Sequence, residues 1–406
     1  MELKPASTPR PLLTVIIPCH EFTEELANVL NSINFKAIGR AIEVFVVDDR
    51  YDNTIYDFVL PYLEKYSTQI FYYKSNGGTV KSSWANAVKT GLIYSTGAFI
   101  KIIDTDDSFD FFGLPILMDD LYYVISKAAL TPDLVISSYD FSRDGFNTKT
   151  SFQFSNAIKG ARSRNIVNSD KLTIKENLSY HSLVFKRDIF EKFKELSIDT
   201  GTSELHLVLE SIRYANKVMF TGKDLNVVNY SALSYDEILI PELIGEHSHN
   251  LLKSLEFNID LFDASGLQGK KKENSIRMLI NFIYHVLLAI SLNDSITPAV
   301  KDTSCNDVKK HISKKFSDSK DFKNVIKNID ALIKTKYNLK TTHKIAEAAY
   351  GNKYKYFEQS ISRIKKSHDT KKKVPYLSSK EEVRVLPHIK KNTTAHVFNK
   401  HPLEKH

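Results

Sequence analysis

Residues 98–107 have the sequence AFIKIIDTDD, in which an apolar run is followed directly by three carboxylates. The apolar run predicts a buried β-strand, and Asp104, Asp106 and Asp107 follow where that strand ends. Carboxylates one residue apart at a strand end can converge on one hard cation such as Mg²⁺ or Mn²⁺, whose remaining positions phosphate oxygens can take. An ordinary acidic turn is the alternative interpretation.

Three further strand patterns precede this one, and each is followed by a helical pattern. The strands are expected at residues 12–17, 42–47 and 70–73, and the helices at about 21–33, 54–66 and 80–92. Such alternation predicts an α/β fold whose central sheet is mainly parallel, with helices on both faces. Ligands bind at the carboxyl ends of strands in sheets of this kind. Those ends carry residues 19–21, 48–50 and 104–107, and the acidic character of the last two indicates a cation.

The sequence has no glycine-rich phosphate cradle. No G-x-G-x-x-G follows the first strand, and no G-x-x-x-x-G-K-[ST] occurs anywhere in the chain. These absences argue against a dinucleotide-binding fold of the usual kind and against a P-loop enzyme. If phosphates are bound, a metal ion is then expected to hold them.

The order and spacing of several short blocks resemble family 2 glycosyltransferases with the GT-A fold, over about residues 12–236. The matching blocks are TVIIP at 14–18, VVDD at 46–49, NGG at 76–78, GAFI at 97–100, DTDD at 104–107, LVFKRDIF at 183–190 and SELHL at 203–207. The resemblance implies inverting transfer of a hexosyl or N-acetylhexosaminyl group from a nucleotide diphosphate donor, expected to be a UDP-sugar. It also implies a Mn²⁺ or Mg²⁺ cofactor and a hydroxyl acceptor on a glycan, a lipid-linked molecule or a protein.

The resemblance assigns a role to each matching residue. Asp106 would be the main metal ligand, Asp104 would lie near the metal and the ribose, and Asp107 would lie near the donor sugar or the metal. Glu204 would be the general base that deprotonates the acceptor hydroxyl. The nucleotide pocket would be lined by Pro18, Cys19, Glu21 and Asp49, with Asp49 on the uracil ring.

The chain departs from the family pattern at three places. Arg50-Tyr51-Asp52 stands where glycine and serine are usual, Ala87-Val88-Lys89 stands for Ala-Arg-Asn, and Ser203-Glu204 stands for Glu-Asp. Lys89 or Arg50 could replace the arginine that touches the donor diphosphate, and Lys89 is the candidate we retain. Two alternatives stay open: a sugar-phosphate nucleotidyltransferase, and a degenerate transferase that only binds.

Some conspicuous residues have structural explanations that compete with functional ones. Trp84 lies on an apolar helical stripe and fits a core position better than a sugar platform. Asp48 could simply satisfy the backbone of a turn. His181 could contact substrate, although a structural role is favoured. Cys19 is expected to be a small buried residue rather than a nucleophile.

Length and composition predict how the chain is organised. We expect an extension at 1–11, the GT-A domain at 12–236, a helical region at 237–364 and a basic tail at 365–406. Only two cysteines occur among 406 residues, which favours a reducing cytoplasm. The net charge of +8 is concentrated in the tail, which could bind an anionic membrane surface or could be solvated. No nucleic acid partner is expected.

One apolar stretch, Met278 to Leu292, is too short to span a membrane as a helix. It could lie in the membrane interface, which would place the protein peripherally at the inner face of the cell membrane. Apolar residues occur nearly all round this helix, however, and an interfacial helix should keep one clearly polar face. Burial within a helical region is therefore the favoured prediction.

Overall fold

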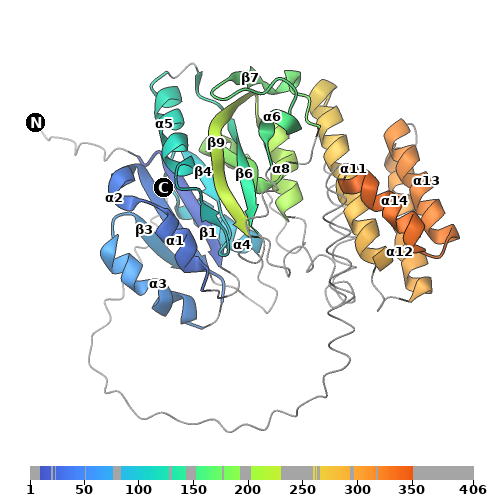
Figure 1. The fold of residues 1–406 in the computed structure, drawn as a ribbon, viewed down its shortest axis with the longest axis horizontal. Coiled ribbons are helices and arrows are strands. Elements are labelled where there is room, and N and C mark those ends of the chain that lie inside the picture. Colours follow the sequence, from blue (N-terminus) through green and yellow to red (C-terminus); the bar gives the residue numbers. More distant parts are fainter. Residues whose placement is uncertain are drawn as a thin grey trace, which may run out of the picture. The chain divides into compact units, whose positions relative to one another are not determined.

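The structure is a computed structural model (Figure 1). The described residues are 10–19, 22, 24–50, 52–75, 84–127, 130–142, 152–175, 178–192, 203–229, 259–260, 262, 266–292, 297–316 and 319–350. The predicted boundaries at 236/237 and 364/365 fall outside these ranges, as does the basic tail. Those boundaries stay predictions.

A single sheet organises the first part of the chain. Among the described residues it contains nine strands in the order β3-β2-β1-β4-β8-β6-β9-β5, with β7 paired to β9. The strands are β1 Leu13–Cys19, β2 Ile42–Asp48, β3 Ile70–Lys74, β4 Phe99–Ile102, β5 Ser108–Phe109, β6 Leu134–Ser142, β7 Ile166–Asn168, β8 Leu183–Lys186 and β9 Lys217–Asn229.

The sheet is mainly parallel, as the strand-helix alternation predicts. β1 pairs in parallel with β2 and with β4, and β2 pairs in parallel with β3. β8 is antiparallel to both β4 and β6, which leaves β6 and its parallel neighbour β9 running in the direction of β4. The short strands β5 and β7 pair antiparallel to β9. The insertion of β8 between β4 and β6 was not predicted.

Helices cover both faces of the sheet. One face packs against α4 and α8, and the other packs against α1, α3 and α5. The helices of this part are α1 Leu26–Ser32, α2 Phe35–Ile38, α3 Thr54–Lys65, α4 Trp84–Tyr94, α5 Gly113–Ile125, α6 Phe154–Ala157, α7 Arg187–Phe190 and α8 Ser203–Tyr214.

The buried carboxylate of Glu43 links β1, β2 and the residues just before β4. This contact lies at the end of the sheet opposite residues 104–107, which are called the acidic turn below. Glu43 accepts hydrogen bonds from the Thr14 hydroxyl at 2.6 Å and from the backbone nitrogens of Thr96 and Gly97 at 2.5 and 2.9 Å. Gly97 packs so closely on β1 that a Cβ atom there would lie 2.7 Å from the Thr14 nitrogen. A side chain at position 97 would therefore push β4 away from β1.

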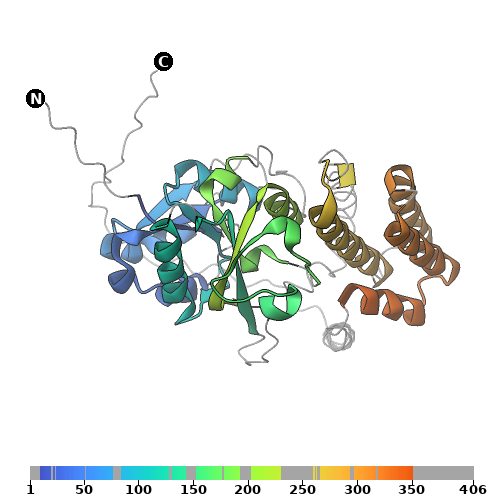
Figure 2. The ribbon, with the colours of Figure 1, turned by 90° about the horizontal axis from the view of Figure 1, so that it is seen from above.

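The helical region contains four long helices among the described residues: α11 Gly269–Leu292, α12 Pro298–Phe316, α13 Lys320–Lys334 and α14 Leu339–Tyr350. They share one apolar core, and α12 and α13 lie side by side in both views (Figures 1 and 2). Asn274 of α11 accepts a hydrogen bond from the Ile174 nitrogen at 3.1 Å and donates one to the Leu172 carbonyl at 3.1 Å. α11 thus joins the helical core to the segment that follows β7.

The apolar face of α11 is buried, as the favoured prediction states. Met278 packs against the core of the sheet, whereas Leu279, Ile283 and Leu287 are fully enclosed in the helical core. These side chains are therefore not an exposed face that could enter a membrane interface. Within the described part of the chain, no helix combines the length and hydropathy that crossing a bilayer requires.

Candidate active site

The carboxyl ends of β1, β2 and β4 meet because β1 lies between the other two strands. Cys19 is in register with Asp48, and the Asp49 nitrogen donates to the Cys19 carbonyl at 2.9 Å. On the other side of β1, the Ile103 nitrogen donates to the Ile16 carbonyl at 3.1 Å. The strand order therefore brings the two acidic segments, 48–49 and 104–107, to one edge of the sheet.

Asp104, Asp107 and His181 form a cluster that suits a metal ion. One potential ligand atom from each residue lies within 4.8 Å of the other two. His181 Nδ1 lies 3.0 Å from an oxygen of Asp107, whose side chain is only 1% exposed. His181 belongs to the short 3₁₀ turn η4, Tyr180–Ser182, which leads into β8. Because β8 pairs with β4, this histidine lies beside the acidic turn, although it is 74 residues from Asp107 in the sequence.

Two aromatic residues orient Asp104. Trp84 Nε1 donates to one carboxylate oxygen at 2.9 Å, and the Tyr180 hydroxyl donates to the other. The two rings pack edge to face with centroids 5.1 Å apart. Trp84 does pack against the core as predicted, but its indole nitrogen also belongs to the site. A carboxylate held by two donors presents its remaining lone pairs in a fixed direction.

Lys101 lies beneath the acidic turn and is completely buried. Its Nζ donates to the His181 carbonyl at 2.5 Å, and the Leu183 carbonyl is 3.5 Å away. Burial lowers the pKa of Lys101 to about 7, while the carboxylates of Asp107 and Asp104 act in the opposite direction. The ammonium group is therefore enclosed by protein but faces the negative charge of the turn.

Asp106 lies between the two clustered aspartates in sequence but outside the three-residue cluster. Burial raises the pKa of Asp106 to about 7, and the nearby carboxylates of Asp107 and Asp104 add to the effect. Without a cation, burial and the neighbouring carboxylates thus disfavour the ionised form of Asp106. A cation bound beside them would favour ionisation, so its binding at neutral pH should release a proton from this turn.

This raised pKa predicts a pH-dependent stability in the metal-free protein. A carboxyl group that holds its proton more tightly when folded stabilises the fold at low pH, and that contribution falls as pH rises from about 4 to about 7. The Asp106→Asn variant lacks this titrating carboxyl group. Its free energy of unfolding, relative to that of the wild type, should therefore increase over this pH range by on the order of 1 kcal/mol or more. Urea unfolding of both proteins at several pH values, in the presence of chelator, measures this difference in free energy. A difference that does not change with pH would contradict the raised pKa of Asp106.

The donor set fits a divalent cation. Carboxylate oxygens suit Mg²⁺ and Mn²⁺, and an imidazole nitrogen is accepted more readily by Mn²⁺ than by Mg²⁺. Three protein ligands would leave positions for phosphate oxygens. Asp104 and Asp107, both predicted site residues, are thus joined by His181 as a third candidate ligand. For His181 the sequence favoured a structural role.

The predicted nucleotide-pocket residues lie at the ends of β1 and β2. Pro18 and Cys19 close β1, and Cys19 is fully buried, as expected. Burial raises the pKa of the Cys19 thiol well above its usual range, with Asp48 and Asp104 adding to it. Asp49 follows β2 and is buried, whereas Glu21 lies outside the described residues. The nucleotide contacts of these residues stay predictions.

Asp48, the residue before Asp49, binds the backbone of a turn, which is the structural role that the sequence analysis considers for it. Asp48 accepts a hydrogen bond from the Arg50 nitrogen at 2.8 Å and another from the Tyr72 hydroxyl at 2.5 Å. The Arg50 guanidinium instead pairs with Asp52 at 2.5 Å. Asp48 therefore stabilises the turn after β2, and Arg50 is engaged on the exposed side of that turn.

Lys89 and the predicted base occur on two helices, α4 and α8, that pack against the same face of the sheet. Lys89 lies on α4 close enough to His206 of α8 to affect its titration. Burial lowers the pKa of His206 to about 4, and the charges of Lys89 and Arg213 lower it further. Glu204 falls in the first turn of α8, but its side chain lies outside the described residues. The roles of Lys89 and Glu204 stay predictions.

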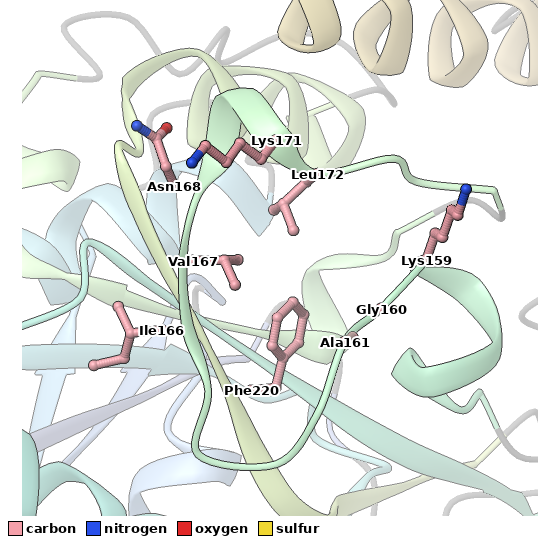
Figure 3. Close-up of a pocket in the computed structure, with 9 residues that line it drawn as sticks. All are labelled: Lys159, Gly160, Ala161, Ile166, Val167, Asn168, Lys171, Leu172 and Phe220. Atoms are coloured by element: carbon pink, nitrogen blue, oxygen red, sulfur yellow. The ribbon is translucent and has the colours of Figure 1, made fainter.

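A shallow pocket of about 270 Å³ lies away from this cluster. Figure 3 shows the ring of Phe220 at its floor and the amino groups of Lys159 and Lys171 on opposite sides. The pocket adjoins β7, which pairs with the first residues of β9. Since β9 runs in the direction of β4, this is the opposite end of the sheet from the acidic turn. The clustered carboxylates, rather than this pocket, mark the candidate active site.

Comparison with known proteins agrees with this geometry. Residues 14–193 match the family model described as glycosyl transferase family 2. Residues 14–193 thus form a domain of that family. Its fold is the predicted GT-A type, and a transferase is thereby favoured over a nucleotidyltransferase. No curated protein matches the chain.

Several solved structures of a Staphylococcus aureus protein are similar to the chain. TarS 1–349 in complex with UDP-GlcNAc is 13% identical with a TM-score of 0.49, and the match covers 87% of this chain and 92% of that one. TarS 1–349 in complex with UDP is 15% identical with a TM-score of 0.43, covering 80% and 91%. A longer TarS structure is 16% identical with a TM-score of 0.42, covering 79% of this chain and 55% of that one. The match therefore spans about half of the longer TarS chain.

Proposed function

We propose that this family 2 domain transfers a sugar from a UDP-sugar to a hydroxyl group, with inversion and with the help of a divalent cation. The observation that carries the proposal is the cluster of Asp104, Asp107 and His181 at the carboxyl edge of the sheet. When bound there, the cation would neutralise the charge that develops on the departing diphosphate. The acceptor would be a glycan, a lipid-linked molecule or a protein, and the sugar a hexose or N-acetylhexosamine.

The residues of the chain have distinct tasks in this reaction. Asp104, fixed by Trp84 and Tyr180, and Asp107, paired with His181, would hold the cation, which would supply positive charge for the diphosphate of the donor. Asp49 at the end of β2 would bind the uracil ring. Glu204 on α8 would take the proton of the acceptor hydroxyl. The acceptor oxygen then bonds to the anomeric carbon, the bond from that carbon to the diphosphate breaks, and UDP leaves.

Incubation with a panel of UDP-sugars tests the proposal directly. We expect at least one donor to release UDP slowly through hydrolysis when Mn²⁺ is present, and this release to stop with chelator. Release that is equal with and without chelator would contradict the role of the cation. If no UDP-sugar binds or reacts, the interpretation as a degenerate binding module would replace that of an active transferase.

Contact of the tail with anionic membranes is a separate prediction that vesicle sedimentation tests.

A further inference from the structure

Lys101 is a feature of the site that neither metal binding nor base catalysis uses. We propose that Lys101 is a positioning residue: its ammonium group fixes the backbone of the turn η4, so that the His181 imidazole stays against Asp107. This inference rests on the proposed function for its purpose, but the position of the His181 ring can be tested without any cation. Lys101 touches neither substrate nor metal in this scheme and acts through His181.

The geometry shows why the turn needs such a support. The ladder between β6 and β8 ends with the pair Ile136 and Leu183, and the ladder between β4 and β8 ends with Ile100 and Phe185. Residues 180–182 lie beyond these last pairs, so the sheet does not hold them directly.

Side chains from the neighbouring strands hold this turn instead. Lys101 of β4 donates to the carbonyls of His181 and Leu183 at 2.5 and 3.5 Å. Ser137 of β6 donates to the carbonyl of Ser182 between them, at 3.1 Å. Three consecutive carbonyls therefore face buried donors. With its backbone held in this way, His181 keeps its Nδ1 atom 3.0 Å from a carboxylate oxygen of Asp107.

The electrostatics point to the same role. Removing an ammonium group from water is unfavourable unless opposite charge and hydrogen bonds compensate for it, and an apolar side chain of the same length would avoid that cost. The compensating charge near Lys101 is that of Asp104 and Asp107. In its protonated form, Lys101 places a positive charge beneath the turn, which reduces the repulsion between these carboxylates before a cation arrives.

A second buried lysine provides a matched control. Lys301 in the helical region is 7% exposed, and its Nζ donates to the Ser291 carbonyl at 2.7 Å. It therefore shares burial and a carbonyl partner with Lys101 but belongs to another core. Replacing each lysine by methionine removes the charge and keeps most of the apolar stem. The two variants separate an effect on the site from the general effect of losing a buried ammonium group.

The first measurement uses the full-length protein in chelator, with histidine rings labelled for NMR and the His181 signal identified by its loss in His181→Gln. We expect Lys101→Met to shift this signal and Lys301→Met to leave it unchanged. The second measurement is calorimetric titration of Mn²⁺ in the presence of UDP. Lys101→Met should weaken Mn²⁺ binding by about 10- to 100-fold, as found when residues supporting metal ligands are removed. Lys301→Met should bind like the wild type.

The outcomes distinguish this inference from the proposed function. If the wild type fails to bind Mn²⁺ with UDP, the cation in the proposed function is wrong, and the His181 signal alone decides the role of Lys101. If Lys101→Met leaves that signal unmoved, Lys101 is a structural core residue and the inference is wrong. If Lys101→Met does not unfold cooperatively, it is not properly folded, and Lys101→Leu takes its place. The His181 signal is then measured in the leucine variant.

Discussion

Asp107→Asn should abolish the Mn²⁺-dependent binding of UDP while the chain stays folded. Asp107 contributes a carboxylate to the three-residue cluster and is the partner of His181. Its replacement removes one ligand and leaves a second ligand without the contact that orients it. Changes to residues that only support metal ligands weaken affinity by about 10- to 100-fold. A ligand itself should cost more than 100-fold, which calorimetry with UDP and Mn²⁺ would measure.

Asp110→Asn is the matched control for this experiment. Asp110 lies three residues further along and accepts hydrogen bonds from the backbone nitrogens of Phe112 and Gly113, both at 2.9 Å, where α5 begins. An asparagine can accept the same bonds, so UDP binding should be unchanged. Asp106→Ala addresses the family-based assignment of Asp106 as the main ligand. Wild-type affinity in Asp107→Asn together with a complete loss in Asp106→Ala would move the metal site to Asp106.

Glu204→Gln should bind the donor normally and lose sugar transfer by roughly 10²- to 10⁴-fold, the usual contribution of a general base. The amide keeps the size of the side chain but cannot accept the acceptor's proton. Glu204 lies in the first turn of α8, the helix that packs on the same face of the sheet as α4. Turnover with the donor identified by UDP release measures the effect, and UDP affinity measured in parallel shows whether binding is intact.

Glu210→Gln on the same helix is the control for the base. Glu210 is buried and pairs with Arg213 at 3.3 Å, and burial raises its pKa. Its carboxyl group is thus engaged within the helix, and we expect its replacement to leave the ratio of transfer to donor binding unchanged. Wild-type turnover in Glu204→Gln would show that another carboxylate is the base. Loss of transfer in Glu210→Gln alone would identify Glu210, and retention in both would point to Asp199.

The parallel half of the fold could be predicted because its information is local. Apolar runs that end at charged or turn-forming residues indicate β1, β2, β3 and β4, and the helical spacing between them indicates α3 and α4. The predicted strands at 42–47 and 70–73 agree with the observed bounds to within one residue. The burial of α11 was also predictable, because a helix that is apolar nearly all round has no polar face for water.

The amino-acid sequence by itself determined that acidic residues follow two strands of a mainly parallel sheet, and parallel strands necessarily place their carboxyl ends at one edge. Only the tertiary structure decided which other residues meet them there. Tyr180, His181 and the carbonyls that Lys101 holds reach the turn because β8 inserts between β4 and β6. No local pattern reports that insertion, since a short apolar strand is compatible with many neighbours and its place depends on pairing energies summed over the whole sheet.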